Sequence, residues 1–318
     1  MDFWPTDDQA ALQEGVRTFC QGRFPFETLH DIEAAGGRID RSAWKDIADM
    51  GVFSLRTDGF GITDAALVFE ELGRALVPGP LVATYLAATH LSDSAAASGA
   101  AIIGLAEVAE PVTVIEHADD LDVLLLLDSN GVRRMAPDAL PTDVVERPVD
   151  PLTPLRLAHA VTAGGDMVLS GADARAFRLE GTLLTAAMQV GVSFAAIDLA
   201  VEYAKGREQF GRPIGQFQAV KHMCADMLTR AEVARSAMYA AAANLEGKGE
   251  DDAEHAVRVA KMLAGDAAIF CGKTGIQLHG GMGFTWEVNA QRFWKRATVL
   301  DTHFGNSDIH ADAIAAAM

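Results

Sequence analysis

The chain has 318 residues, half of them hydrophobic, and a formal net charge of −18. This length and composition predict a globular protein of two or three packed units and exclude a largely disordered chain. The excess of carboxylates argues against binding along nucleic acid or on an anionic membrane, although a local basic turn can still hold a small anion.

Three widely spaced cysteines, Cys20, Cys224 and Cys271, favour buried free thiols in a reducing compartment and lack the spacing of a metal site. The acidic start of the chain does not resemble a secretory signal. The longest uncharged stretch, residues 182–197, is too short and too polar to span a membrane. We therefore expect a cytoplasmic protein with no metal.

Helices dominate the first hundred residues. Asp7 and Asp8 can cap the first helix, whose apolar residues recur on one face. Gly51 and the run Pro78-Gly79-Pro80 mark later helix ends. Three further helices are expected over residues 42–48, 65–76 and 81–91. Residues 1–100 are thus predicted to form an N-terminal helical domain.

Short apolar runs typical of strands replace this pattern after residue 100. They lie at residues 101–105, 112–115, 123–127, 155–162 and 167–169. The segment Asp128-Ser129-Asn130-Gly131 between two of these runs predicts a β-hairpin. No glycine fingerprint of a Rossmann domain follows any run. We predict a reduced, mostly antiparallel β domain over residues 101–174.

The remaining chain is helical in pattern from Phe177 onward. Residues 220–245 repeat apolar side chains every three or four positions, which indicates core packing rather than a cofactor site for its methionines. Further helices are expected over residues 254–278 and 307–317. Long helices with short connections predict a C-terminal four-helix bundle over residues 175–318.

One turn interrupts the long helices, and residues 207–218 there read Arg-Glu-Gln-Phe-Gly-Arg-Pro-Ile-Gly-Gln-Phe-Gln. Its glycines and proline cannot continue a helix. Arg207, Arg212 and Lys221 make the turn cationic, and an arginine fork can hold a phosphate. The alternative is that Arg207 pairs with Glu208 or Glu202 on the surface.

A second turn follows, where residues 277–287 read Gln-Leu-His-Gly-Gly-Met-Gly-Phe-Thr-Trp-Glu. Paired glycines let backbone N–H groups approach ligand oxygens with no β-carbon in the way. An ordinary helix C-cap explains the same glycines without a ligand.

Together the two segments resemble the Arg-x-x-Phe-Gly…Phe-Gln loop and the Gln-x-x-Gly-Gly-x-Gly-Tyr/Phe-x-x-Glu signature of acyl-CoA dehydrogenases. Residues 69–75, Phe-Glu-Glu-Leu-Gly-Arg-Ala, are also similar to that family. The resemblance covers most of the chain, weakly in the middle. It implies a mainly α acyl-CoA dehydrogenase-like fold, FAD as cofactor and an acyl-CoA substrate.

In that family the two segments reach the nucleotide half of the FAD held in a neighbouring subunit. Carried over position by position, the resemblance implies cofactor-binding roles for Arg207, Phe210, Gln218, Gln277, Gly280 and Gly281.

Two departures affect catalysis. Phe304 falls where the family's usual glutamate base stands, and a phenyl ring cannot take a proton. Some members place the base on the first bundle helix, where the count back from Arg207 reaches Gly181, so the adjacent Glu180 is the remaining candidate. Asp301, one turn before Phe304, is a further one.

The family's Thr-Glu-x-x-x-Gly-Ser-Asp-like loop over the flavin is also missing, since residues 105–110 retain only its glutamate. No tryptophan occurs between Trp44 and Trp286 to supply the family's Trp-bearing strand. The residues kept serve a neighbour's FAD, and those lost serve the chain's own flavin ring and base.

These departures lead to the hypothesis that the chain is one subunit of a heteromeric dehydrogenase. It resembles the α₂β₂ enzymes that actinobacteria use on CoA esters of steroids, in which a related chain supplies the base and the flavin cradle. A self-sufficient homotetramer using Glu180 is one alternative. A flavin-free scaffold or binding protein on the same fold is another.

Overall fold

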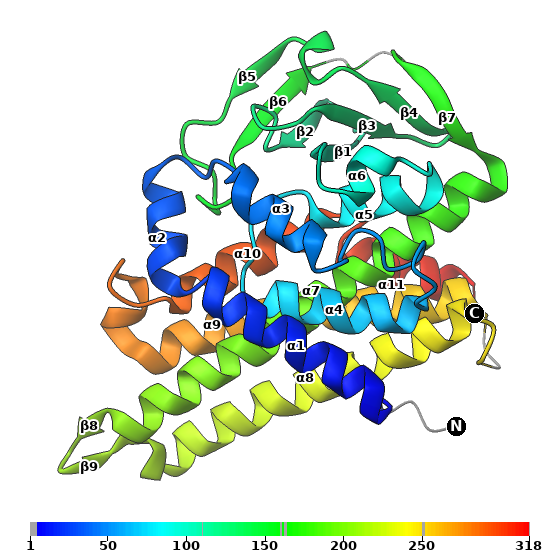
Figure 1. Ribbon diagram of the computed structural model, residues 1–318. Coiled ribbons are helices and arrows are strands. Elements are labelled where there is room, and N and C mark those ends of the chain that lie inside the picture. Colours follow the sequence, from blue (N-terminus) through cyan, green and yellow to red (C-terminus); the bar gives the residue numbers. More distant parts are fainter. Residues whose placement is uncertain (1–4, 110, 160, 162–163, 250–251, 318) are drawn as a thin grey trace. The chain divides into compact units, whose positions relative to one another are not determined.

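The structure is a computed structural model that describes residues 5–109, 111–159, 161, 164–249 and 252–317. It is mostly helical with a small β region, as the sequence predicts (Figure 1). The N-terminal helices are α1 (Asp7–Arg23), α2 (Phe26–Ala34), α3 (Arg41–Asp49), α4 (Ile62–Arg74), α5 (Leu81–His90) and α6 (Ser94–Ala97). Of these, α2 and the short α6 were not expected from the sequence.

By packing, the chain divides into two compact units. The mixed unit comprises residues 22–65 and 78–181, and the bundle unit comprises residues 1–21, 66–77 and 182–318. The domain boundaries expected from the sequence, 1–100, 101–174 and 175–318, stay a prediction.

The strands of the mixed unit form two sheets. They are β1 (Ile103–Glu107), β2 (Val112–Glu116), β3 (Val123–Leu127), β4 (Gly131–Met135), β5 (Thr142–Val144), β6 (Leu155–His159) and β7 (Asp166–Ser170). The sheet orders are β1-β3-β4-β7 and β2-β6-β5, and every pair is antiparallel except β1 with β3. The end expected for the sixth strand, Thr162, lies outside the described residues.

The predicted hairpin joins β3 to β4. Leu127 pairs with Val132, and Asp128 Oδ1 accepts hydrogen bonds from the backbone N–H of Asn130 at 2.6 Å and of Gly131 at 3.0 Å. The aspartate side chain thus satisfies the backbone of the turn, which explains why this short polar segment reverses the chain.

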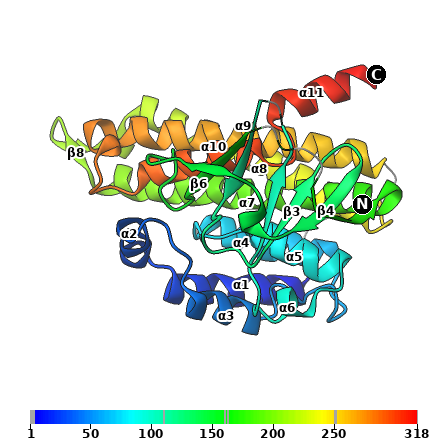
Figure 2. The same ribbon diagram turned by 90° about the horizontal axis from the view of Figure 1, so that it is seen from above.

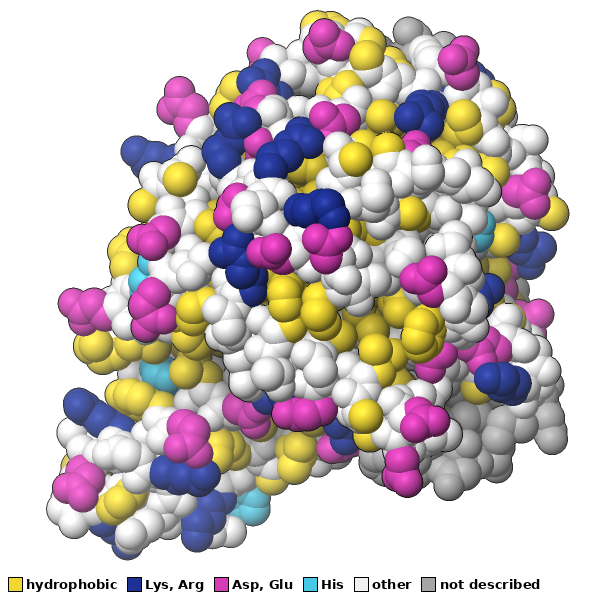
Figure 3. Space-filling model, in the orientation of Figure 1, with side chains coloured by type: hydrophobic (Ala, Val, Ile, Leu, Met, Phe, Trp, Pro, Cys, Tyr) yellow, Lys and Arg dark blue, Asp and Glu magenta, His cyan; other side chains and the backbone are white. Residues whose placement is uncertain are grey.

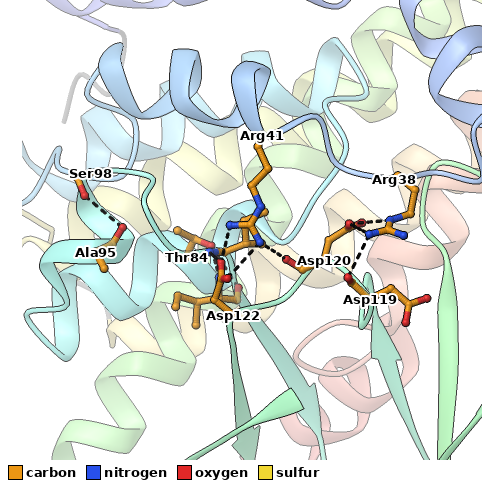
Figure 4. A network of polar contacts seen from close by, with 10 residues as sticks. Arg38, Arg41, Thr84, Ala95, Ser98, Asp119, Asp120 and Asp122 are labelled. Atoms are coloured by element: carbon orange, nitrogen blue, oxygen red, sulfur yellow. Dashed lines mark hydrogen bonds and ion pairs between the residues drawn. The ribbon is translucent and has the colours of Figure 1, made fainter. Parts of the chain in front are cut away.

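Two arginines fasten α3 to the loop between β2 and β3 (Figure 4). Arg38 Nε donates to Asp120 Oδ1 at 2.7 Å, and Arg41 forms a two-pronged pair with the carboxylate of Asp122 at 2.7 and 3.1 Å. Asp122 also accepts from the backbone N–H of Ile102 at 2.8 Å. This network holds the sheets of the mixed unit against its helices.

The bundle unit is built on long helices. They are α7 (Gly171–Gly206), α8 (Gln218–Leu245), α9 (Ala253–His279), α10 (Ala290–Thr302) and α11 (Ser307–Ala316), with the strands β8 (Glu208–Gln209) and β9 (Arg212–Pro213) between α7 and α8. Helix α9 packs against α8, α10 and α11, and Figures 1 and 2 show α8 and α9 side by side. Helices α8, α9 and α11 correspond to those expected over residues 220–245, 254–278 and 307–317, and α7 covers the helical pattern predicted from Phe177 onward.

The apolar repeat of α8 faces the core, as expected. Met227, Ala231, Ala234 and Met238 are fully buried, which confirms their packing role. Helix α10 was not expected, because its buried face carries the polar residues Gln291, Arg292 and Arg296, and these hide the apolar period that signals a helix.

Helix α7 is long and apolar enough by composition to cross a membrane, but 72% of its most apolar window is buried within the protein. In the bundle unit it packs closely on the last turns of α4. A β-carbon added at Gly191 would lie 1.8 Å from the carbonyl oxygen of Glu70, so only glycine permits this approach.

Candidate cofactor-binding end of the bundle unit

The cationic turn is a tight hairpin at the end of α7. The backbone N–H of Ile214 donates to the carbonyl of Arg207 at 2.8 Å, and β8 pairs with β9. Phe210 and Gly211 form the two-residue tip, with φ of 55° and 78°. Glycine adopts such angles freely, but a phenylalanine there is strained, and backbone strain of this kind gathers at functional sites.

The tip presents aromatic and cationic side chains to the surface. Phe210 is 91% exposed, and its ring meets the edge of Phe217 at a centroid distance of 6.0 Å. The guanidinium of Arg212 lies over the Phe217 ring at 4.3 Å. Dark blue and yellow side chains accordingly mark this end at the lower left of Figure 3.

Arg207 is exposed, and its guanidinium forms neither a hydrogen bond nor an ion pair with any residue that the structure describes. The sequence left open a pairing with Glu208 or Glu202. Glu202 instead binds Lys205, whose Nζ lies 2.6 Å from its Oε1. The structure therefore leaves the Arg207 fork available to a ligand.

Helix α8 begins beside this arginine. Gln218 is its first residue and is exposed, and the preceding Phe217 provides no side-chain cap for the first turn. Uncapped N–H groups at a helix N-terminus attract anions. With Arg207 and Lys221 nearby in the chain, this end of α8 suits a phosphate group.

The second turn begins where α9 ends. Gly280 has φ 62° and ψ −142°, a conformation open essentially to glycine alone, and its N–H donates to the carbonyl of Gln277. The C-cap interpretation thus accounts for Gly280. It does not account for Gly281, where an added β-carbon would meet no atom within 4 Å. Gln277, Gly280 and Gly281 are all exposed.

One contact brings the two turns together. The ring of Tyr203, in the last turns of α7, stacks on the ring of His279 at 4.1 Å, and its hydroxyl donates to the carbonyl of His279 at 3.4 Å. All six predicted cofactor residues therefore lie exposed at one end of the bundle unit. The sequence did not single out Tyr203, and it gave no signal for this contact.

Two more exposed aromatic residues belong to the same end. Phe284 is 75% exposed and Trp286 is 59% exposed, and the ammonium of Lys295 lies 4.2 Å above the Trp286 ring. Large exposed aromatic rings mark interaction surfaces. In the sequence, only their position directly after the glycine pair could have indicated that Phe284 and Trp286 belong to this surface.

Phe304 occupies the position to which the sequence resemblance assigns the family's usual base. Phe304 is buried, has φ 54°, and its carbonyl accepts a hydrogen bond from His310 Nε2 at 3.0 Å. Asp301 accepts a hydrogen bond from Ser307 Oγ at 3.0 Å, and its carbonyl accepts one from Lys261 Nζ at 3.2 Å. These bonds give Asp301 a structural role.

Glu180 lies in a polar cluster of the mixed unit. Its Oε1 accepts from the Tyr85 hydroxyl at 3.0 Å, and its Oε2 lies 2.8 Å from His90 Nε2, which must carry the hydrogen to donate. The Glu180 side chain is 12% exposed. Burial and the Glu180 charge raise the pKa of Tyr85. These contacts hold the Glu180 carboxylate in one position.

The remnant of the flavin loop is also engaged. Glu107, at the end of β1, lies 3.5 Å from the guanidinium of Arg178, which also donates to the carbonyl of Asp128 at 3.2 Å. Glu110, the second glutamate of the segment, lies outside the described residues.

Comparison with known proteins identifies the family of the chain. Residues 6–97 match the acyl-CoA dehydrogenase N-terminal domain, and residues 176–318 match the acyl-CoA dehydrogenase C-terminal domain. The acyl-CoA dehydrogenase FadE34 of Mycobacterium tuberculosis is 35% identical over 95% of this chain, which spans 47% of FadE34. The acyl-CoA dehydrogenase IpdE2 of the same organism is 31% identical over 92% of both chains.

Solved structures show the same fold. The ChsE4–ChsE5 complex from M. tuberculosis superposes with a TM-score of 0.83 at 24% identity, covering 99% of this chain and 98% of the matched chain. A variant of the Tcur3481–Tcur3483 steroid ACAD gives 0.84 at 21% identity, covering 98% and 97%. Taken with the two domain matches and IpdE2, these similarities establish that the chain belongs to the acyl-CoA dehydrogenase family of oxidoreductases.

Proposed function

We propose that this chain is one subunit of a heteromeric acyl-CoA dehydrogenase and completes the FAD site of a related partner chain. The observation that carries the proposal is a contrast. The six residues suited to a nucleotide are exposed at one end of the bundle unit, whereas the usual base position holds the buried ring of Phe304.

The residues present fit the nucleotide half of FAD. Arg207 and the uncapped start of α8 would hold the pyrophosphate. The exposed Gly281 would offer its backbone N–H, and no packing contact explains why a glycine stands there. When bound, FAD accepts the hydride that leaves the β-carbon of the thioester. The α-proton requires a carboxylate, which the partner would provide.

Two similar proteins support a heteromer and a lipid substrate. One is described as a complex of ChsE4 with ChsE5, and the other is a steroid ACAD named for Tcur3481 and Tcur3483. By analogy, we infer that the substrate is the CoA thioester of a steroid or related lipid. The enzyme would act in the cytoplasm, in a heterotetramer with the partner chain.

The test is to purify the chain alone and with each candidate partner encoded nearby, and to record flavin absorbance and acyl-CoA oxidation. Flavin and activity are expected only in the mixed assembly. A yellow, active homomer would refute the subunit role.

Substitution of Arg207 by alanine sharpens the test. In the assembly, R207A is expected to weaken FAD retention at least tenfold, because hydrogen bonds to a charged group are strong ones. The matched control is K205A, which removes an equal charge two residues away and should leave retention unchanged. Unaltered retention in R207A would favour a flavin-free scaffold.

Glu180 supports one second candidate, a self-sufficient homotetramer. Its carboxylate is partly buried and held by Tyr85 and His90, as a positioned base requires. Replacement by glutamine keeps the shape and removes the base. Activity of the homomer abolished by E180Q would favour this candidate, and an active mixed assembly carrying E180Q would exclude it.

A further inference from the structure

The core of the bundle unit contains a polar side chain that the proposed function does not use. Gln189 on α7 is fully buried, and neither its Nε2 nor its Oε1 hydrogen-bonds to any residue in the described part of the chain. A buried amide with no partner is costly, and native cores satisfy such groups with protein atoms or ordered water.

The amide faces other polar groups across Gly265 of α9. A β-carbon added at Gly265 would lie 2.4 Å from both Asp301 Oδ1 and Ser307 Oγ, and 3.4 Å from Gln189 Nε2. The three atoms therefore converge on one face of Gly265. These distances place Gln189 Nε2 no farther than about 5.8 Å from either oxygen, and two hydrogen bonds of about 2.9 Å each let one water join polar atoms up to that far apart.

The charges around this point favour a neutral molecule. Lys261 is fully buried, donates to the carbonyl of Asp301 at 3.2 Å, and lies 3.9 Å from Asp301 Oδ1. The buried ammonium disfavours a second cation, and the carboxylates of Asp301 and Asp266, which both interact with Ser307, disfavour an anion. Water can donate to Gln189 Oε1 and to Ser307 Oγ, whose own hydrogen is donated to Asp301, while it accepts from Gln189 Nε2.

We propose that one buried water molecule beside Gly265 bridges the Gln189 amide to Ser307, which in turn donates to Asp301. It joins α7 to the turn between α10 and α11, the turn that carries Phe304. This water would stabilise the fold and take no part in catalysis. Its test therefore measures unfolding and does not depend on the test of the proposed function.

The test is the substitution Gln189→Met, which keeps the side-chain length and removes the amide. If water satisfies the amide, the folded-to-unfolded equilibrium constant is expected to fall at least tenfold in chemical denaturation of the full chain. If no water binds the Gln189 amide, removing the amide leaves the folded-to-unfolded equilibrium constant unchanged or raises it. That result would overturn the proposal. Met188→Leu, an apolar exchange at the next residue, controls for repacking.

A double-mutant cycle with Ser307→Ala locates the bridge. The two substitutions are expected to be coupled, because each removes a partner of the same water. Strict additivity would overturn the bridge even if Gln189→Met alone destabilises. Crystals of the unaltered protein provide a readout that needs no variant, since an empty density map between Gln189 and Ser307 would also refute the site.

Discussion

Tyr203 stacks on His279 at a centroid distance of 4.1 Å, and this contact sets the spacing between the two turns of the candidate cofactor site. Arg207 follows Tyr203 by one helical turn, and its N–H donates to the Tyr203 carbonyl at 2.8 Å. Gly280 follows His279 directly. A single ring pair therefore positions both the cationic and the glycine-rich segments.

Loss of this ring pair should loosen the site. In the mixed assembly, Tyr203→Leu is expected to weaken FAD affinity about tenfold, because the two turns lose their common support; aromatic pairs contribute about 0.5–1.5 kcal/mol. The measurement is titration of the apoprotein with FAD. Tyr203→Phe is the control and should stay near the unaltered value, because it keeps the stack and removes only the long hydrogen bond to His279.

The close approach of α7 to α4 gives a prediction about stability. Gly191→Ala is expected to lower the free energy of unfolding by about 3 kcal/mol, since the new methyl group would collide with the backbone of Glu70. Gly206→Ala is the control on the same helix, where a β-carbon meets no atom within 4 Å. It should be neutral or slightly stabilising. Equal effects of the two would contradict the close crossing.

Glu70 gives a prediction about stability between acidic and neutral pH. Burial, opposed in part by Arg235, raises the pKa of Glu70 from 4.5 to about 7, and its Oε2 accepts from the Tyr239 hydroxyl at 3.1 Å. The folded state thus holds a proton that the unfolded state releases. The contribution of this proton to the free energy of unfolding is fully present below pH 4.5, and about 3 kcal/mol of it is lost as pH rises through 7. Glu70→Gln should remove this loss in denaturant titrations.

His310 gives the opposite slope. Burial, aided by the charge of Lys261, lowers the pKa of His310 from 6.5 to about 4. Between these values the unfolded state binds a proton that the folded state does not. The contribution of neutral His310 to the free energy of unfolding is therefore fully present above pH 6.5, and about 3 kcal/mol of it is lost as pH drops through 4. His310→Gln keeps a donor for the Phe304 carbonyl and should abolish this loss.

Between pH 4.5 and 6.5 the two effects oppose each other, so the unaltered protein should show a nearly flat profile there. Stability should rise with pH in Glu70→Gln and fall with pH in His310→Gln. The same slope in both variants would show that other groups control the profile.

Local patterns predicted much of the fold. The apolar repeat of α8 and the Asp128 hairpin depend on neighbouring residues, and both were confirmed. Helix α10 was not predicted from the sequence, because Arg292 and Arg296 are buried on its packed face, where a helical pattern requires apolar residues. Only tertiary packing makes such positions acceptable to arginine, as when Arg296 donates to the Val77 carbonyl at 3.1 Å.

In the candidate site, too, local sequence segments predicted some features, and others depended on distant parts of the chain. Its six residues followed from two local segments, whereas the partners of Glu180 come from α5, about ninety residues earlier in the chain. The sequence also could not predict that the Arg207 guanidinium is available, because Glu202 and Glu208 were equally close partners in the chain and Glu202 pairs with Lys205 instead. Which of several neighbouring charged residues form an ion pair is decided by the folded structure.

The exposed rings of Phe210, Phe284 and Trp286 carry a consequence for the cell. A copy that lacks its partner leaves this aromatic surface in water, where it is a target for chaperones, proteases and self-association. Surplus copies would therefore be short-lived, and the abundance of this polypeptide would follow the synthesis of its companion rather than its own.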